Sequence, residues 1–452
     1  MNSFIIDSSL FKDQVGTEEM RAVFSDEAMM QSWLDSWAAL AEAEAEVGIV
    51  PKEAAEVIRA HAHYEEMDFD AVRKQMKVVD HPLMAQIEEF TRICGPKAGG
   101  WIHWGATTQD IMDTGVVLCL KKAYDIILRD TKILLAEALE KAKTYRDLPM
   151  AGRTHGQHAV PITMGYKFAI WADEFGRSLE RLKEGKDRFL MGQLSGAAGS
   201  LASLGDKGLE VQKRFCRILG LSQNTITWHV ERDGYGELAS DLAILAGTIG
   251  KIANEIINLE RTEIGEIEES DAKGRIGSST MPQKRNPMTC ENMLANVRVI
   301  QNDASLALQA MIQEHERDMT FWQTEWVYLP EMCILLAGTM DMMKRVFHTM
   351  VIHEDRVKEN LYSTHGLIMA ERCMLELGKT LGRLTAHDIL HSACTTAFKE
   401  KRPLEAVLLE DKRVTEKLSK KEIEDLLKPE NYLGSCGAMV DRVVEKWGSV
   451  RE

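Results

Sequence analysis

The feature that most limits what this chain can fold into is a long central stretch without proline. None of its ten prolines lies between Pro161 and Pro282. Proline breaks a helix interior because it lacks an N–H donor and its ring collides with the preceding turn. A proline-free stretch of this length therefore permits very long helices, and the hydrophobic pattern inside it has to show whether they form.

Apolar residues inside this stretch recur at helical spacing. The clearest series, with steps of three and four residues, is Leu242, Leu245, Ile249, Ile252, Ile256 and Leu259. Such a series forms one apolar seam along a helix and indicates packing in a bundle. Alternation of β-branched and polar residues is scarce along the chain. The sequence therefore predicts an all-α protein without a sheet.

Shorter helices are expected on both sides of the central ones. We predict an N-terminal helical domain over residues 1–105, in which Ser25 is suited to be a helix N-cap. A central long-helix domain over 106–355 includes a polar loop at 273–288, and a C-terminal helical domain covers 356–452. The apolar seam in the middle of the chain favours oligomerisation through the central helices.

Composition excludes some classes of partner. The net charge of −15 argues against nucleic acid, because binding phosphates requires a basic face. It still allows an anionic substrate, since cations can cluster locally on an acidic protein. The eight cysteines form no CxxC pair, which is typical of a reducing compartment. The N-terminus lacks the pattern of a signal peptide, and no uninterrupted apolar run has the length of a membrane span. We therefore expect a cytoplasmic protein without a membrane partner.

Three polar segments interrupt the helical pattern: His103–Thr114, Met150–Thr163 and Lys273–Asn292. Loops on a rigid scaffold are where binding sites are commonly built. The third segment combines serine hydroxyls with the cations Lys284 and Arg285. This combination suits binding a carboxylate and stabilising added negative charge on it. From composition alone, a solvated linker with an ordinary helix cap explains the segment equally well.

The third segment contains GSSTMPQKRNP, which resembles the signature loop of the fumarase/aspartase superfamily. Within that superfamily, MAGRTHGQHAVPITMGYK, GQLSGAAGSLASLG, WHVERD and HERDMTFWQTEWVYLPE are most similar to bacterial 3-carboxy-cis,cis-muconate cycloisomerases, and next to adenylosuccinate lyases. Both families usually carry histidine where this chain has Gln283. Glutamine at that position is more typical of the argininosuccinate lyase branch.

The resemblance implies an all-α, three-domain fold with a long central helical bundle. It also implies a homotetramer whose active sites are shared between subunits, with no cofactor and no metal. The implied chemistry is reversible addition and elimination across a C=C bond next to a carboxylate, through an aci-carboxylate carbanion. The substrate would be a small di- or tricarboxylate. The first expectation is lactonisation of 3-carboxy-cis,cis-muconate in aromatic catabolism.

Two alternatives remain at this point. One is adenylosuccinate lyase or a related fumarate-releasing C–N lyase. The other is a non-catalytic scaffold on the same fold, as in the lens crystallins related to argininosuccinate lyase.

Catalytic roles are carried over from the matched motifs. Ser278 is expected to be the base, which requires that water be excluded and that backbone N–H groups stabilise the serine oxyanion. Lys284 is expected to stabilise the carboxylate that gains charge. His155 is the expected acid, because histidine titrates near neutrality, and His81 would assist it. His158 completes a His-x-x-His pair with His155, but the sequence offers no third ligand, so we predict no metal site.

Binding roles are carried over in the same way. The expected substrate-binding residues are Thr107, Thr108, Thr154, Gln193, Arg232, Ser279 and Asn286. Asp110 is expected only to cap the helix that follows it, and Arg153 to tie loops together rather than bind a carboxylate. Trp322 and Trp326 are expected to pack in the core.

Overall fold

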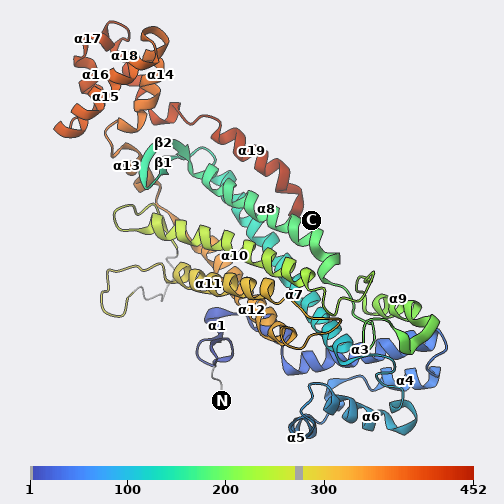
Figure 1. Cartoon of the computed structure of the whole chain (residues 1–452). Coiled ribbons are helices and arrows are strands. Elements are labelled where there is room, and N and C mark those ends of the chain that lie inside the picture. The colour runs from blue at the N-terminus through green and yellow to red at the C-terminus, as the bar shows by residue number, and fades with distance from the viewer. Residues whose placement is uncertain (1–3, 270–277, 452) are drawn as a thin grey trace. The chain divides into compact units, whose positions relative to one another are not determined.

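The computed structural model describes residues 4–269 and 278–451 and is built almost entirely from helices (Figure 1). The predicted all-α class is confirmed. The expectation that no sheet forms is wrong, because two small antiparallel sheets are present. One pairs β1 (Pro149–Thr154) with β2 (Gln157–Thr163), and the other pairs β3 (Ile267–Glu268) with β4 (Val351–Ile352).

Five long helices occupy the middle of the chain: α7 (Thr108–Thr144), α8 (Met164–Phe189), α10 (Asp233–Glu260), α11 (Met288–Gln309) and α12 (Trp322–Thr349). The seam predicted from leucine and isoleucine spacing lies on α10, and each of its six side chains is at most 1% exposed. Burial of such a stripe is what holds a long helix in a bundle.

By length and composition alone, α10 is apolar enough to cross a bilayer, and it is the one such helix among the described residues. Half of its most apolar window is buried inside the protein. A core helix of a soluble protein passes the same test, so α10 is weak evidence for a membrane span.

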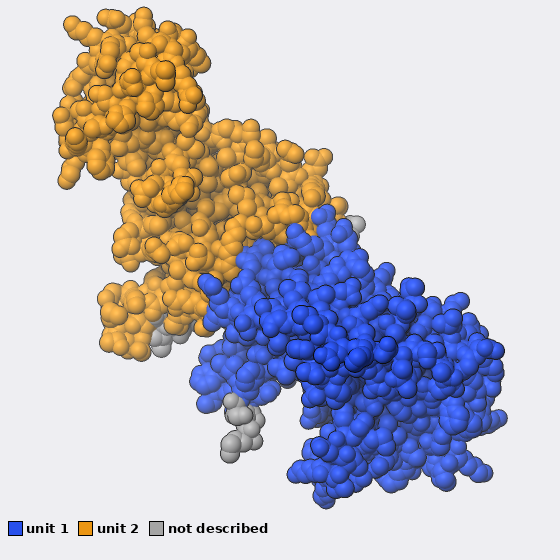
Figure 2. Space-filling model, in the orientation of Figure 1, with its two compact units in different colours: residues 1–131, 178–249, 295–341 blue, residues 132–177, 250–294, 342–452 orange. Residues whose placement is uncertain are grey.

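Contacts divide the chain into two compact units (Figure 2). Unit 1 contains Met1–Thr131, Ser178–Ile249 and Ala295–Asp341, and unit 2 contains Lys132–Arg177, Gly250–Leu294 and Met342–Glu452. Each of the five long helices contributes residues to both units. The division into three consecutive domains stays a prediction.

Unit 1 has its main core among the N-terminal helices. Trp37 stacks on Phe90 with ring centroids 5.8 Å apart, and both side chains are at most 1% exposed. Ser25 is the N-cap of α3, as predicted, because its Oγ accepts a hydrogen bond from Ala28 N over 3.2 Å. The helices of this unit besides the long ones are α1 (Lys12–Val15), α2 (Glu18–Val23), α3 (Asp26–Glu46), α4 (Lys52–Ala60), α5 (Phe69–Val79), α6 (Met84–Gly99) and α9 (Gly208–Leu219).

Unit 2 has an aromatic core between two of the long helices, where Trp171 of α8 stacks on Phe347 of α12 at 6.3 Å. A separate hydrophobic cluster joins α14 to α18, which lie together in Figure 1. The shorter helices of this unit are α13 (Glu354–Tyr362), α14 (Ala370–Leu381), α15 (Arg383–Glu400), α16 (Leu404–Glu410), α17 (Lys412–Thr415), α18 (Lys420–Leu426) and α19 (Cys436–Trp447).

All eight cysteines are free thiols, and all except Cys394 are buried. Burial raises the pKa of the Cys216 thiol to about 12, which makes it a poor nucleophile and a poor metal ligand at neutral pH. Buried free thiols of this kind are consistent with the absence of CxxC pairs in the sequence.

Candidate functional site

The first polar segment ends inside α7, because α7 begins at Thr108. The second half of this polar segment is therefore helical, and the helix expected from about residue 110 begins at Thr108. Asp110 does cap the helix, since its Oδ2 accepts a hydrogen bond from Thr107 N over 2.9 Å. A carboxylate that reaches back in this way satisfies one of the free donors at a helix start. Ile111 is fully buried and anchors the same turn in the core.

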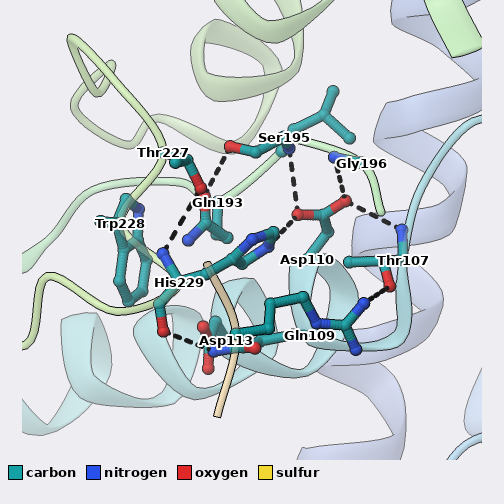
Figure 3. Close-up of polar contacts among 12 residues, drawn as sticks. Thr107, Gln109, Asp110, Asp113, Gln193, Ser195, Gly196, Thr227, Trp228 and His229 are labelled. Carbon is teal, nitrogen blue, oxygen red and sulfur yellow. Dashed lines mark hydrogen bonds and ion pairs between the residues drawn. The ribbon is translucent and has the colours of Figure 1, made fainter. Parts of the chain in front are cut away.

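Asp110 also binds residues far away in the sequence (Figure 3). Its Oδ1 accepts from Ser195 N over 3.0 Å and from His229 Nε2 over 2.8 Å. Its Oδ2 accepts from Gly196 N over 2.9 Å. The side chains of Asp110 and His229 are fully buried. Sequence reasoning assigned Asp110 to capping alone and missed these three further contacts.

The hydroxyl of Thr107 and the hydroxyl of Thr108 each contact one polar side chain from elsewhere in unit 1. Thr107 Oγ1 accepts a hydrogen bond from Arg317 Nη1 over 2.6 Å, and Thr108 Oγ1 lies 3.4 Å from His81 Nε2. His81 Nδ1 accepts from two backbone N–H groups at the start of α6, so the ring proton of the neutral form is on Nε2. The structure thus brings His81, Thr107 and Thr108 together. Arg317 was not singled out from the sequence, although it lies in the quoted segment HERDMTFWQTEW.

Two other candidates in unit 1 lie deeper in the protein. Gln193 is fully buried, and its Oε1 accepts from Ser195 Oγ over 2.9 Å. Arg232 is 2% exposed and forms ion pairs of 2.9 Å with both Asp113 and Glu325. A guanidinium held between two buried carboxylates has little remaining capacity for a substrate anion. This arrangement favours a structural role for Arg232.

Two aromatic predictions in unit 1 hold. Trp322 is 1% exposed, and its Nε1 donates to Asp113 Oδ1 over 2.7 Å. Trp326 packs edge-on against it at 5.1 Å. His103, at the start of the first segment, accepts from Trp37 Nε1 through Nδ1, and burial lowers its pKa to about 4. His103 is therefore neutral and structural.

In unit 2, the second polar segment is a β-hairpin. His155 and Gly156 form its two-residue turn with φ of 53° and 75°. Positive φ at both positions is typical of a type I′ hairpin turn, and histidine enters the left-handed region more readily than most residues. His155 and Thr154 are both exposed at the tip. The His-Gly pair between extended residues was the signal for this turn.

A buried ion pair anchors this hairpin. Arg153 donates to both carboxylate oxygens of Glu266, over 3.0 and 2.5 Å, and Asn360 Nδ2 donates to the same carboxylate over 2.8 Å. Glu266 is fully buried. The prediction that Arg153 ties loops together is confirmed. Burial, together with the nearby Arg153 cation, lowers the pKa of His158, the second histidine of this segment.

The third segment is described from Ser278 onward; residues 273–277 of the predicted loop lie outside the described residues. Ser278 Oγ accepts hydrogen bonds from Met281 N over 3.0 Å and from Thr280 N over 3.3 Å. Ser279 and Lys284 are exposed. Lys284 and Asn286 line an open pocket of about 720 Å³, together with the end of α10, β3 and His353.

The candidate residues fall into two groups, one in each unit. Unit 1 brings together Thr107, Thr108, His81 and Arg317, and unit 2 contains the His155 hairpin and the signature loop. Among the described residues, no group of three or more His, Cys, Asp or Glu side chains is arranged to hold a metal ion. The sharing of these parts between subunits stays a prediction.

Two known family models match most of the chain. A family model described as "Lyase" matches residues 12–301, and a second one, "Adenylosuccinate lyase C-terminus", matches residues 366–443. The chain belongs to the fumarase/aspartase superfamily. It is accordingly an enzyme of a group whose members are named lyases and cycloisomerases and act on small carboxylates.

Three members of the superfamily show the range of related activities. An N-acetyl-S-(2-succino)cysteine lyase of Enterococcus italicus is 43% identical over 99% of this chain and 98% of its own. An adenylosuccinate lyase of Methanocaldococcus jannaschii is 40% identical over 95% of this chain and 94% of its own. The crystal structure of a 3-carboxy-cis,cis-muconate lactonizing enzyme from Pseudomonas putida superposes with a TM-score of 0.92, at 35% identity, over 98% of this chain and all of that one.

Proposed function

We propose that this enzyme releases fumarate from a succinylated thiol of the N-acetyl-S-(2-succino)cysteine type. The observation that carries the proposal is the 43% identity to a lyase of that name, spread over 99% of the chain. A second named lyase for the same compound, from Dickeya dadantii, is 40% identical over 98% of this chain.

The elimination proceeds in two steps. A base removes the proton from the carbon next to one carboxylate of the succinyl group, and that carboxylate takes up the negative charge. The electron pair then forms the C=C bond of fumarate while the C–S bond breaks and the thiolate leaves. The thiolate takes up a proton, so the products are fumarate and a free thiol, with no oxidant or reductant involved.

Ser278 is the proposed base. The two backbone N–H groups that donate to its Oγ support this role, because they would stabilise negative charge on the oxygen. Lys284 and Asn286 belong to the same loop, line the pocket, and supply a cation and an amide for the carboxylate that gains charge. Ser279, next to the base, supplies a further hydroxyl for binding.

The other substrate carboxylate is assigned to Thr107 and Thr108. His155 is the proposed acid, with His81 assisting it. Thr154 and Gln193 are proposed to complete the substrate contacts. A thiol has a reference pKa of about 8.5, so a thiolate leaves far more easily than an amine anion. The demand on His155 as proton donor is therefore smaller for a thioether than for a succinylated amine.

Lactonisation of 3-carboxy-cis,cis-muconate is the second candidate function. The similarity of MAGRTHGQHAVPITMGYK and neighbouring segments supports it, as does the TM-score of 0.92 to a lactonizing enzyme. Cleavage of adenylosuccinate is a third, supported by the match over residues 366–443. The sequence lacks an evident arginine and tyrosine for a nucleotide phosphate near its N-terminus, which favours the other two.

The deciding experiment offers the purified protein all three compounds in parallel. Fumarate is followed by ultraviolet absorbance and the free thiol by a thiol reagent. We expect thiol and fumarate in equal amounts from N-acetyl-S-(2-succino)cysteine, at a rate well above those with the other two compounds. Rapid lactonisation without thiol release would establish the cycloisomerase function instead. Fast cleavage of adenylosuccinate alone would establish the C–N lyase.

A further inference from the structure

The carboxylate of Asp110 joins three separate parts of unit 1. Each of its oxygens accepts two hydrogen bonds: Oδ1 from Ser195 N and His229 Nε2, and Oδ2 from Thr107 N and Gly196 N. The side chain is fully buried. Figure 3 shows the carboxylate at the centre of this group of donors. No acceptor position on either oxygen remains for a substrate, so Asp110 has no direct catalytic role.

Further hydrogen bonds, donated by Arg317, hold Thr107 on its side-chain side. Arg317 Nη1 donates both to Thr107 Oγ1 and to Ala197 O, at 2.6 and 3.2 Å. Ala197 follows Gly196, whose N–H returns to Asp110. The backbone and the hydroxyl of Thr107 are therefore held from both sides.

This arrangement decides how the two threonine hydroxyls can act. Thr107 Oγ1 accepts from Arg317, so its own O–H proton is left to donate elsewhere. Thr108 Oγ1 lies within reach of the Nε2 proton of His81, so it too can accept there and donate its own proton. Two O–H donors beside a guanidinium at the start of a long helix suit one carboxylate.

We infer that Asp110 is a positioning residue: with His229 it holds Thr107 and Thr108 as paired O–H donors to one carboxylate of the substrate. The inference rests on the proposed function only for the presence of that carboxylate. It predicts that Asp110 acts on substrate binding and not on the proton-transfer step, because the four hydrogen bonds to its carboxylate come from Thr107, Ser195, Gly196 and His229, and none of these is the proposed base.

Asp110→Asn tests the inference sharply. One of the two oxygens becomes an NH2 group, so two of the four donors face another donor instead of an acceptor. We expect KM for N-acetyl-S-(2-succino)cysteine to rise about tenfold or more, the effect of losing a hydrogen bond to a charged group. We expect kcat to stay within about threefold of wild type, since binding is lost equally in the ground and transition states.

Asp130→Asn is the matched control, because Asp130 is also a buried carboxylate of α7 and is 2% exposed. It accepts a hydrogen bond from Arg129, and it lies about six helical turns from Thr107. We expect its KM to stay at the wild-type value. An unchanged KM in folded Asp110→Asn, or an equal rise in Asp130→Asn, would overturn the inference.

His229→Phe answers the same question if Asp110→Asn does not fold. This variant removes the side chain that fixes Oδ1 and keeps the three backbone donors. A raised KM with preserved kcat supports the inference, and an unchanged KM contradicts it.

The double variant Thr107→Val/Thr108→Val separates the carboxylate site from the positioning role of Asp110. If it raises KM while the Asp110 and His229 variants do not, the carboxylate site is supported and the positioning role is rejected. If it leaves KM unchanged, the carboxylate site itself is rejected.

Discussion

The backbone N–H of Met281 donates a hydrogen bond to Oγ of Ser278 over 3.0 Å, within the signature loop itself. Thr280 N donates to the same oxygen over 3.3 Å. A serine hydroxyl is a weak acid, and its oxyanion is accessible only where fixed donors stabilise it. The local fold of the loop already supplies two such donors, before any substrate or closure of the loop is considered.

Removing the base should abolish turnover without abolishing binding. We expect Ser278→Ala to lower kcat by several orders of magnitude while the substrate still binds, because the base acts only in the proton-transfer transition state. Steady-state kinetics and equilibrium binding of substrate to the variant measure the two effects separately. The neighbouring Ser279→Ala is the comparison, with a smaller expected loss. A Ser278→Ala enzyme that keeps a tenth of wild-type turnover would exclude Ser278 as the base.

Removing the loop cation should affect binding and turnover together. Lys284→Met deletes a charge that the proposed mechanism uses in both the ground and the transition state, with the larger effect where charge accumulates. We expect KM to rise and kcat to fall further. Arg285→Gln removes the adjacent cation, which pairs with Glu268, and should change kcat much less. Near-normal kinetics in Lys284→Met would mean that this side chain faces solvent and does not contact the substrate.

Breaking the anchor of the His155 hairpin should cost stability as well as activity. Arg153→Met leaves the buried Glu266 carboxylate with Asn360 and without its cation. Loss of one partner of a buried pair typically costs about 3–5 kcal/mol. Chemical denaturation measures this change, and Arg188→Met, at a largely exposed pair with Glu237, should cost under about 1 kcal/mol. Equal losses in the two variants would show that the anchor is no stronger than a surface pair.

Glu44 should make stability fall as pH rises. It is fully buried in α3, neither carboxylate oxygen has a hydrogen-bond partner among the described residues, and burial raises its pKa to about 9. Between its usual value of 4.5 and about 9, the unfolded chain loses this proton while the folded protein keeps it. The stability linked to Glu44 is therefore complete below pH 4.5 and is lost as pH rises toward 9.

Glu44→Gln removes this dependence. We expect the variant to match wild type near pH 4.5 and to be more stable at pH 7, on the order of 3 kcal/mol. Melting temperatures across this pH range measure the difference, with the exposed Glu53→Gln as control. A constant offset between variant and wild type at every pH would show that Glu44 ionises normally in the folded state.

The protein is expected to assemble as a homotetramer through its long helices. Several large apolar side chains on α10, α11 and α12 are substantially exposed in the single chain, including Ile244, Val299, Leu308 and Val327. Large apolar side chains exposed on bundle helices are suited to burial between subunits. Light scattering on the purified protein tests the assembly. A stable monomer with full activity would contradict active sites shared between subunits.

The sequence by itself determined the helical architecture and the identity of the motif residues. Helix periodicity is a local property, so the six-residue seam from Leu242 to Leu259 was sufficient to predict a long buried helix. The signature GSSTMPQKRNP is contiguous, so it identified the superfamily without any knowledge of the fold. Resemblance in other segments singled out His81, Thr107 and Thr108, which the structure brings together in unit 1.

Only the tertiary structure decided which distant groups meet. Asp110 and His229 are 119 residues apart, and Arg153 and Glu266 are 113 apart. No local spacing records such a pair, because a buried polar group can be satisfied by any donor that the fold brings within hydrogen-bond distance. For the same reason, the sequence did not show that Arg232, an expected substrate contact, forms buried ion pairs with Asp113 and Glu325. Nor did it show that Asp110, expected only as a cap, also binds two distant segments.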